Sequence, residues 1–434
     1  MDLENYIKGK KAKVAIIGLG YVGLPHALEI AKAGFDVFGI DIKKERVNLI
    51  NSGKSYIGDV KSEDLAKMVG TGKIKAYSDF EKVKEANVVI ICVPTPLDKN
   101  KNPDISYIKN SAFEIKKQIR KGQLIILEST TYPGTTDEIL LPMFEESGLK
   151  CGADFYLAFA PERIDPGSKV PFDEVPKVVG GITEECTKIA VVFYSQFLKF
   201  VHPVSSAKAA EMTKILENTY RLINISMINE LALLCGKMRL DIWEIIEAAK
   251  TKPYGFTAFY PSPKIGGHCI PLDPFYLSHK AKEYNFWARF IELAGEINEQ
   301  MPHFTITKVN YLLNQNKKPI NGSKILVWGA AYKKDIADTR ESAAYDVIKI
   351  LLKKGAKVDF FDPFAKEIEV KDAVLGKKIM VSIEYKLEIL NDYDLVLILT
   401  DHSGFDYEEI ASNSKLVVDT RNAIKSRSHT NVVW

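Results

Sequence analysis

The sequence of 434 residues has few cysteines and no long hydrophobic segment. Its five cysteines stand at positions 92, 151, 186, 235 and 269 and form no Cys-x-x-Cys pair. This pattern predicts neither a metal cluster nor a disulfide framework, and free thiols in a reducing cytoplasm are the simplest interpretation. The longer apolar runs, such as 87–93, have the length of a strand and are too short to span a membrane. The charged amino terminus lacks the apolar core of a signal peptide.

Charge of one sign is also lacking. The 59 basic and 56 acidic residues leave a net charge of only +3, which argues against a large nucleic-acid-binding surface. A hydrophobic content of 46% with 26% charged residues is ordinary for a soluble protein. The length exceeds what one hydrophobic core usually fills, so two or three domains are expected.

A glycine-rich turn follows a short β-branched run at 13–17 and leads into an apolar helical pattern. In such a turn Gly18 permits the tight bend, Gly20 lets the backbone approach a pyrophosphate, and Gly23 allows close packing of helix on strand. A second short strand ends at Asp41, whose carboxylate can accept hydrogen bonds from ribose hydroxyls and would repel a 2′-phosphate. The segment therefore predicts a dinucleotide site that prefers NAD to NADP.

Two further buried strands are predicted at 88–93 and 124–127, and each ends in a loop that carries threonine. Strands that alternate with helices form a parallel doubly wound sheet, which binds ligands at the carboxyl ends of its strands. The loops with Thr95 and Thr130 fall at those ends. Ordinary turns at the ends of strands would look the same, because proline and threonine favour them.

A long helix is predicted from Ser205 to about Gly236, because that segment lacks proline and internal glycine and its apolar residues recur at helical spacing. A helix of this length usually bridges domains or forms an oligomer interface. Lys214 and Asn218 are four residues apart and project from one face of it. A solvated lysine with a surface asparagine is the plainer alternative.

After residue 301 the pattern of strand, turn and helix returns. A strand at 324–328 enters the turn Gly329-Ala330-Ala331, which cannot reproduce the first fingerprint. We therefore expect a second Rossmann-like sheet that binds a different nucleotide. Its other elements are predicted within 343–352, 357–363, 394–401 and 415–421.

Cys269, in the run Gly266-Gly-His-Cys269, is the residue with the most specific chemistry. A thiolate can trap an aldehyde as a thiohemiacetal, which gives up a second hydride to become a thioester that water hydrolyses to an acid. A dehydrogenase with such a thiol can therefore carry an alcohol through two oxidations.

Taken together, the motifs resemble those of the UDP-glucose/GDP-mannose dehydrogenase family over about residues 11–421. The matching motifs are Gly18-Leu-Gly-Tyr-Val-Gly23, Val93-Pro-Thr-Pro96, Glu128-Ser-Thr130, Pro161-Glu162, Lys214 with Asn218, Gly266-Gly-His-Cys269 with Asp273, Lys333 to Arg340, and Asp419-Thr-Arg421. The resemblance implies an α/β protein with two Rossmann-like doubly wound domains joined by a central helical domain. The expected boundaries are 1–200 for the NAD-binding domain, 201–304 for the central dimerisation and catalytic domain, and 305–434 for the UDP-sugar-binding domain.

The resemblance also implies roles for individual residues. Cys269 is the expected nucleophile, Lys214 and Asn218 stabilise the oxyanion, and Glu162 activates or positions the hydrolytic water. Asp273 orients the lysine and the water, and Thr130 holds the water. The residues expected to bind NAD are Gly18, Gly20, Tyr21, Val22, Gly23, Asp41, Arg46, Pro94, Thr95 and Thr130. Those expected to bind substrate are Glu162, Arg163, Lys214, Asn218, Tyr260, Gly266, Lys333 and Arg421.

Two segments indicate the branch of the family. Residues 162–167 and 251–261 look closest to the branch that oxidises UDP-N-acetylglucosamine or its galacto epimer, for surface polysaccharides. The second segment lacks the arginine that many relatives lend across a dimer interface, and Lys252 is a candidate replacement. The expected protein is a cytoplasmic homodimer with a UDP-sugar substrate, no nucleic-acid or membrane partner and no metal.

Other functions remain open at this stage. A UDP-N-acetylmannosamine or UDP-glucose dehydrogenase would carry the same motifs. A two-electron hydroxyacid-type dehydrogenase would have no use for Cys269, and a catalytically silent binding protein would not need Lys214, Asn218 and Glu162 intact.

Overall fold

The computed structural model describes residues 3–58, 60–98, 101–165, 167–168 and 170–434. The chain forms two compact units. The first comprises Met1–Glu217 and Phe275–Trp287, and the second comprises Asn218–Pro274 and Ala288–Trp434. Within the described residues, no helix is both long and apolar enough to cross a membrane.

The first unit is built on an eight-stranded sheet, counted over the described residues, in the order β3-β2-β1-β4-β5-β6-β7-β8. All neighbouring strands are parallel except β6 and β7, and the first six follow the Rossmann order. The strands are β1 (Lys13–Ile17), β2 (Asp36–Ile40), β3 (Ile74–Tyr77), β4 (Val88–Ile91), β5 (Leu124–Leu127), β6 (Tyr156–Phe159), β7 (Lys177–Gly181) and β8 (Val201–Pro203). The strands predicted beside the glycine turn and before Thr95 and Thr130 are therefore present.

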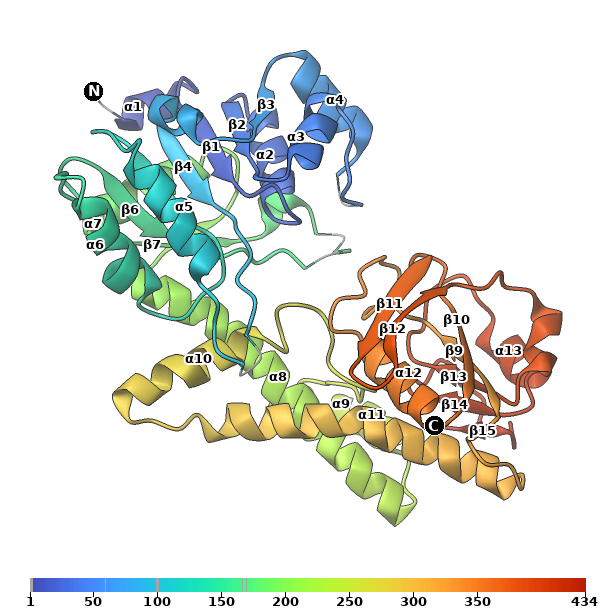
Figure 1. Cartoon of the computed structure of the whole chain (residues 1–434). Coiled ribbons are helices and arrows are strands. Elements are labelled where there is room, and N and C mark those ends of the chain that lie inside the picture. The colour runs from blue at the N-terminus through green and yellow to red at the C-terminus, as the bar shows by residue number, and fades with distance from the viewer. Residues whose placement is uncertain (1–2, 59, 99–100, 166, 169) are drawn as a thin grey trace. The chain divides into compact units, whose positions relative to one another are not determined.

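Both faces of this sheet are buried, because successive side chains of a strand point to opposite faces. Val14, Ile16 and Ile90 pack with α2 and α7 in one core, while Ile17, Ile91 and Ile125 pack with α5 in the other. Figure 1 shows the helices around this sheet. They are α1 (Leu3–Lys8), α2 (Gly23–Lys32), α3 (Lys44–Asn51), α4 (Ser62–Gly70), α5 (Ser106–Lys116), α6 (Leu141–Glu145) and α7 (Glu184–Tyr194).

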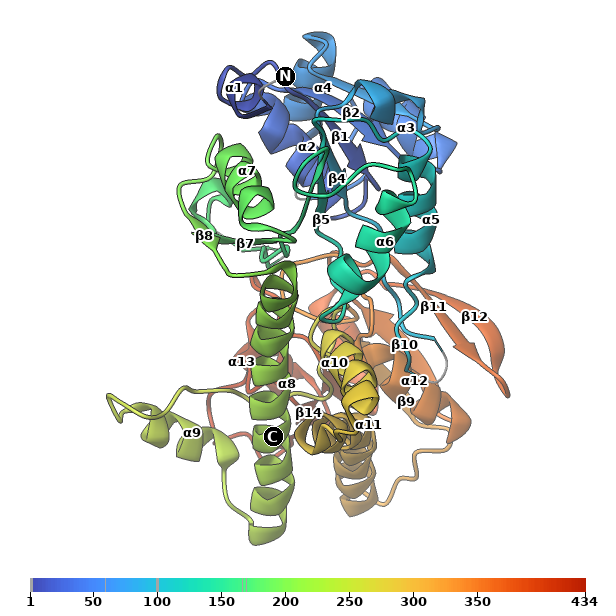
Figure 2. The same ribbon diagram turned by 90° about the vertical axis from the view of Figure 1, so that its left-hand side faces the viewer.

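Helix α8 (Ala207–Met238) is 32 residues long and continues from the first unit into the second. It confirms the long helix predicted from Ser205, displaced by about two residues. In the second unit it packs on α11 (Arg289–Gln315), where the Ser226 hydroxyl donates to the Ala294 carbonyl at 3.0 Å. Figure 1 shows α11 crossing α8, and Figure 2 gives the view along α11. Two shorter helices are α9 (Ile242–Lys250), in the second unit, and α10 (Asp273–Ala281), which belongs to the first unit from Phe275 onwards.

The second unit contains a parallel sheet in the order β10-β9-β13-β14-β15. Side chains of these strands also point alternately to the two faces of the sheet. Ile325 and Val327 pack on the face covered by α12 (Ala343–Lys353), and Leu326 and Trp328 pack on the face covered by α13 (Tyr407–Asn413). The fold class predicted from the sequence is thus confirmed. The elements are β9 (Lys324–Trp328), β10 (Lys357–Phe361), β13 (Leu395–Ile398), β14 (Val417–Asp419), β15 (Val432–Val433), α12 (Ala343–Lys353), α13 (Tyr407–Asn413) and the antiparallel hairpin of β11 (Glu367–Asp372) and β12 (Gly376–Val381).

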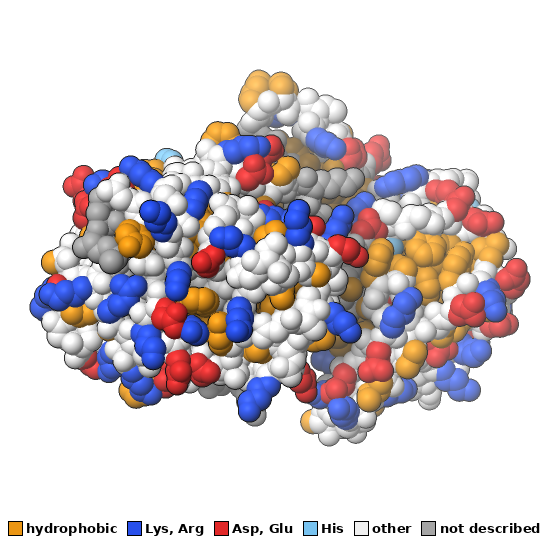
Figure 3. Space-filling model, turned by 90° about the horizontal axis from the view of Figure 1, so that it is seen from above, with side chains coloured by type: hydrophobic (Ala, Val, Ile, Leu, Met, Phe, Trp, Pro, Cys, Tyr) orange, Lys and Arg blue, Asp and Glu red, His pale blue; other side chains and the backbone are white. Residues whose placement is uncertain are grey.

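The surface mixes charges of both signs. On the face drawn in Figure 3, lysine and arginine side chains are interspersed with aspartate and glutamate. This distribution agrees with the small net charge of the sequence.

Candidate functional site

The glycine turn between β1 and α2 has the geometry that a dinucleotide requires. Gly18 has a φ of +89°, and a Cβ at Gly23 would lie 1.9 Å from the Gly18 carbonyl oxygen. Both positions therefore exclude any larger residue. A Cβ at Gly20 would meet nothing within 4 Å, so space for a pyrophosphate remains beside the backbone. Tyr21 and Val22 complete the turn, and Tyr21 is half exposed.

Asp41 lies directly after β2 and holds this turn in place. Its carboxylate accepts hydrogen bonds from the Leu19 N–H at 3.0 Å and the Lys43 N–H at 2.9 Å. The Arg46 guanidinium lies 3.3 Å from the same carboxylate. The carboxylate is thus positioned by backbone donors where the sequence predicts a ribose contact, and Arg46 is the nearest cation.

The loops after β4 and β5 meet each other. Thr95 follows Pro94, and its hydroxyl donates to the Thr130 carbonyl at 2.7 Å. The Tyr276 hydroxyl donates to the Thr95 carbonyl. Tyr276 was not predicted to belong here, because it lies about 180 residues further along the chain. The structure brings Thr95 and Thr130 together at the carboxyl ends of parallel strands.

Glu162 is part of a buried charged cluster with His26, Glu128 and Lys177. No sequence motif predicts this cluster. The Glu162 carboxylate lies 2.8 Å from Nε2 of His26 and 3.2 Å from Nζ of Lys177. Glu128 lies 3.1 Å from the same Nζ and 3.4 Å from His26. The other oxygen of Glu162 accepts from the N–H groups of Arg163 and Ile164. Both oxygens of Glu162 are therefore engaged within the first unit.

The charges in the cluster determine its protonation. Burial alone would raise the pKa of Glu162, but Lys177 and His26 outweigh it and hold the pKa well below its usual range. Burial lowers the pKa of His26 and of Lys177, but the two carboxylates outweigh it and raise both. A carboxylate of low pKa is a weak general base. The cluster thus favours a positioning role for Glu162.

The same cluster has the spacing of a metal site, since ligand atoms of His26, Glu128 and Glu162 lie within 4.8 Å of one another. The Lys177 ammonium lies within 3.4 Å of all three residues. It therefore already supplies the positive charge that a bound cation would bring.

Cys269 lies in a loop fixed by its own backbone. The Asp273 N–H donates to the Cys269 carbonyl at 2.8 Å, and Nε2 of His268 lies 3.6 Å from the Cys269 sulfur. The Asn218 amide donates to the Asp273 carboxylate at 2.6 Å. A Cβ at Gly266 would lie 2.6 Å from the Tyr332 side chain, which explains a glycine there. In the second unit, the loop therefore gathers three predicted catalytic residues.

In the first unit, one predicted residue lies on α8 and another contacts this helix. Lys214 is buried on this helix, one turn before Asn218. Arg163, predicted to bind substrate, pairs with Glu217 at 2.6 Å and donates to the Pro176 carbonyl. The 162–167 segment is thus anchored to α8 through Arg163. Pro166 lies outside the described residues.

In the second unit, a protein carboxylate occupies the degenerate turn. Oδ2 of Asp362 accepts the N–H groups of Ala330 and Ala331 at 2.7 and 2.9 Å, and lies 3.0 Å from Nε2 of His402. Burial opposes ionisation of Asp362, but the bond from His402 and the backbone donors lower its pKa to about 2. These N–H groups are therefore already satisfied by an anion, which explains why this turn need not bind a pyrophosphate.

The remaining predicted substrate residues also lie in the second unit. Arg421 follows β14 and its Nε lies 3.2 Å from Asp401. Lys333 is half-buried just after the degenerate turn. Tyr260 donates to Glu247 at 2.7 Å and stacks on Trp243.

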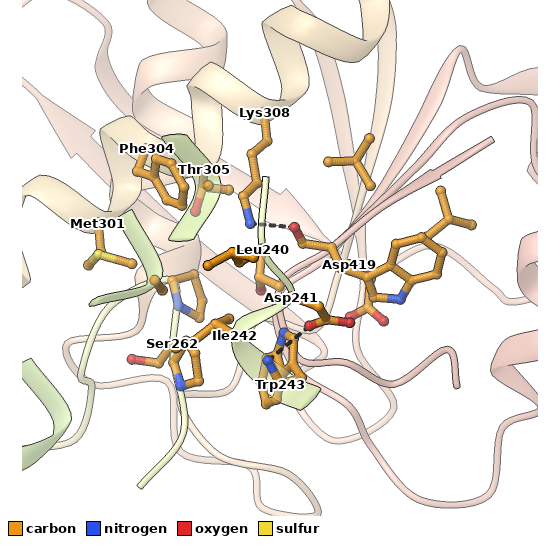
Figure 4. A pocket seen from close by; sticks show the side chains of 18 of the residues that line it. Leu240, Asp241, Ile242, Trp243, Ser262, Met301, Phe304, Thr305, Lys308 and Asp419 are labelled. Atoms are coloured by element: carbon orange, nitrogen blue, oxygen red, sulfur yellow. Dashed lines mark hydrogen bonds between the residues drawn. The ribbon is translucent and has the colours of Figure 1, made fainter. Parts of the chain in front are cut away.

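A cavity of about 370 Å³ lies in the second unit between α8, α11 and the strand end at Asp419 (Figure 4). Lys308 reaches into it and donates to the Trp434 carbonyl at 2.6 Å. Burial lowers the pKa of Lys308 to about 8 and raises that of Asp419. None of the predicted catalytic residues is among the described residues that line it.

Comparison with known proteins assigns the parts of the chain. The NAD binding domain of the UDP-glucose/GDP-mannose dehydrogenase family matches residues 12–198, its central domain 208–300, and its UDP binding domain 326–426. The UDP-N-acetyl-D-mannosamine dehydrogenase of Pyrococcus horikoshii is 36% identical over 95% of this chain and 96% of its own length. The UDP-N-acetyl-D-glucosamine 6-dehydrogenase of Pseudomonas aeruginosa is 34% identical over 84% and 85%. The solved structure of the Pyrococcus horikoshii protein has a TM-score of 0.87 at 32% identity, over 97% of this chain and 98% of that one.

Proposed function

We propose that this chain, which belongs to the UDP-glucose/GDP-mannose dehydrogenase family and is an NAD-dependent nucleotide-sugar dehydrogenase, oxidises the C6 alcohol of a UDP-N-acetylhexosamine to the uronate. The observation that carries the substrate class is that relatives aligned over most of the chain are named for UDP-N-acetylhexosamines. NAD, when bound, accepts a hydride, and two such transfers complete the oxidation from alcohol to acid. A cytoplasmic location and a product destined for surface polysaccharide belong to this proposal.

Cys269 is the proposed nucleophile. Its thiolate adds to the C6 aldehyde, so that the second hydride departs from a tetrahedral thiohemiacetal and leaves a thioester for hydrolysis. Lys214 and Asn218 are assigned to the oxyanion, since a cation and an amide donor stabilise negative charge where it develops. The Asn218–Asp273 hydrogen bond supports this assignment, because it fixes the orientation of the amide.

Glu162 is proposed to position the hydrolytic water rather than to deprotonate it. Its low pKa and its four hydrogen-bonded or ionic neighbours support this role. Thr130 and Asp273 are proposed to hold the same water. Lys333 and Arg421 are assigned to the UDP phosphates and nearby sugar.

Two arguments bear on the epimer. The segments 162–167 and 251–261 favour the gluco or galacto sugar by resemblance. The name of the Pyrococcus horikoshii relative favours the manno sugar. Both candidates share the acetamido group, and a site that hydrogen-bonds this group should reject UDP-glucose strongly.

A substrate panel tests the proposal. Purified protein is given NAD with UDP-N-acetylglucosamine, UDP-N-acetylgalactosamine, UDP-N-acetylmannosamine and UDP-glucose, and NADH is counted per sugar consumed. We expect two NADH per molecule of an N-acetyl sugar. One NADH per sugar would contradict the four-electron reaction, and UDP-glucose as best substrate would contradict the substrate class.

A homodimer built on α8 is also proposed. Six exposed apolar side chains of this helix recur at spacings of three, four and seven residues, which places them within about 60° of arc at roughly 100° per residue. They are Leu216, Tyr220, Met227, Leu231, Leu234 and Met238. Lys214 and Asn218 lie on the opposite, buried side. A stripe of this length is typical of a helix that packs on a second copy.

A further inference from the structure

Two cysteines that take no part in the proposed chemistry face each other in the first unit. The sulfurs of Cys151 and Cys186 lie 3.7 Å apart and are not joined by a disulfide bond. Cys186 is fully buried as the third residue of α7, whereas Cys151 is partly exposed. Cys151 also lines a surface hollow with Gly152, Thr183 and Lys188. A reagent in solution can thus reach Cys151, whereas Cys186 is shielded from solvent and can react only with Cys151.

The surroundings of Cys186 favour its thiolate. Its sulfur accepts hydrogen bonds from the Thr183 hydroxyl at 3.2 Å and from the Leu157 N–H at 3.4 Å. The bond from the Cys151 thiol is the largest influence and, despite burial, the pKa of Cys186 falls to about 6. That bond and burial raise the pKa of Cys151. The hydrogen bond between the sulfurs therefore favours the thiolate of Cys186 over that of Cys151.

We propose that Cys151 and Cys186 form a thiol–disulfide exchange site, which low-molecular-weight disulfides convert into an internal disulfide. Cys186 takes the proton of Cys151, and the Cys151 thiolate attacks the external disulfide RSSR and expels RS⁻. The proton on Cys186 then passes to a thiolate leaving group as RSH. The Cys186 thiolate attacks the Cys151 sulfur and expels the second RS⁻. The cysteine pair loses two electrons, and RSSR gains them as one RSH and one RS⁻, which takes its proton from the solvent.

The geometry supports closure of this bond. A disulfide has a sulfur–sulfur distance of about 2.05 Å, so the two sulfurs need to approach by roughly 1.7 Å. The bond would join the segment after α6 to the first turn of α7, across 35 positions of the chain. Such a link restricts the unfolded chain and should raise the melting temperature of the protein.

The test uses the full chain, treated with 2-hydroxyethyl disulfide, quenched in acid, alkylated and measured by mass spectrometry. For the wild type we expect the loss of about 2 Da, a peptide that links Cys151 to Cys186, and a melting temperature raised by several degrees. Cys186→Ser should instead keep a stable mixed disulfide on Cys151, formed more slowly because the proton acceptor is gone. Cys151→Ser should show neither an adduct nor a cross-link at Cys186, because Cys186 has no exposed surface.

Cys235→Ser is the matched control, since it removes a buried cysteine elsewhere and should behave as the wild type. Circular dichroism establishes that each variant is folded, and Cys186→Ala replaces Cys186→Ser if the latter is not. A wild type that retains both thiols, or that holds the adduct on Cys151 without the cross-link, overturns the proposal. These readouts need no substrate, so their outcome is independent of the proposed enzymatic function.

Discussion

The Asn218 amide donates a hydrogen bond to the Asp273 carboxylate at 2.6 Å, and both side chains are buried. They lie 55 residues apart in the sequence. The Asp273 N–H in turn donates a hydrogen bond to the Cys269 carbonyl. Through Asp273, α8 is thus linked to the loop of the proposed nucleophile.

Asn218→Ala should therefore reduce both stability and turnover. Removing one partner of a buried hydrogen bond costs about 1–3 kcal/mol, which denaturant unfolding measures. Asn224→Ala is the control, because Asn224 lies on the same helix and bonds only its own exposed turn in the described structure. In the double variant Asn218→Asp/Asp273→Asn, the amide at position 273 can donate to the carboxylate at position 218. We expect this variant to regain the unfolding free energy of the wild type but not its kcat. Full recovery of kcat would contradict the proposed role of the Asn218 amide at the oxyanion.

Cys269→Ala should bind NAD and UDP-sugar but form little or no uronate, because the second hydride can leave only from a tetrahedral adduct. Cys269→Ser should accumulate a slowly hydrolysed ester, visible as added intact mass. Product analysis by mass spectrometry separates the two outcomes. Cys235→Ser serves as control, and uronate formed by Cys269→Ala at the wild-type rate would refute covalent catalysis at this position.

Asp41→Ala should narrow the preference for NAD over NADP. The substitution removes ribose hydrogen bonds and the acceptor for the Leu19 N–H, together worth about 1–3 kcal/mol. The KM for NAD should rise about tenfold, while that for NADP should change less. Asp36→Ala on the same strand removes only an exposed pair with Lys73 and should leave both values unchanged. An unaltered cofactor ratio in Asp41→Ala would disprove the assignment.

The buried cluster around Glu162 should make stability depend on pH. The folded pKa of Glu162 is depressed, so its contribution is present above its unfolded pKa of about 4.3 and is lost as the pH falls through the folded value. Between about pH 5 and pH 3, the unfolding free energy of the wild type should therefore fall more steeply than that of Glu162→Gln. If the unfolding free energies of the two proteins fall equally steeply with pH, the Glu162 carboxylate is not held ionised in the folded protein.

Lys177→Met tests the same cluster at neutral pH. It leaves two buried carboxylates without their ammonium and should cost about 3–5 kcal/mol. Lys199→Met breaks only exposed ion pairs with Asp173 and Glu174. Its free energy of unfolding should stay within about 0.5 kcal/mol of the wild-type value. Chemical denaturation of both variants provides the comparison.

Leu231→Glu with Leu234→Glu should convert the proposed dimer into a monomer, because two charges would be buried in an apolar contact. Val374→Glu is the control, since Val374 lies in the β11–β12 turn and its side chain is 81% exposed. Sedimentation velocity at micromolar concentration measures the mass. A wild type that is monomeric and fully active would exclude the dimer.

The sequence by itself determined the features whose parts lie close together along the chain. The turn of Gly18, Gly20 and Gly23 and the acid at Asp41 form one βαβ unit, so their spacing alone predicts a dinucleotide site. Helix α8 was likewise predictable, because helical periodicity is local. Ordered motifs across the chain identified the family and, with it, the fold.

Only the tertiary structure decided which distant side chains meet. Lys177 lies 151 residues from His26, yet it neutralises the cluster that fixes the charge of Glu162. Asp362 fills the degenerate turn at Ala330, and Cys186 reaches Cys151 across 35 positions. Such pairs leave no periodic signal, because strand order and register bring them together. Their protonation then depends on burial and on neighbouring charge, which exist only in the folded chain.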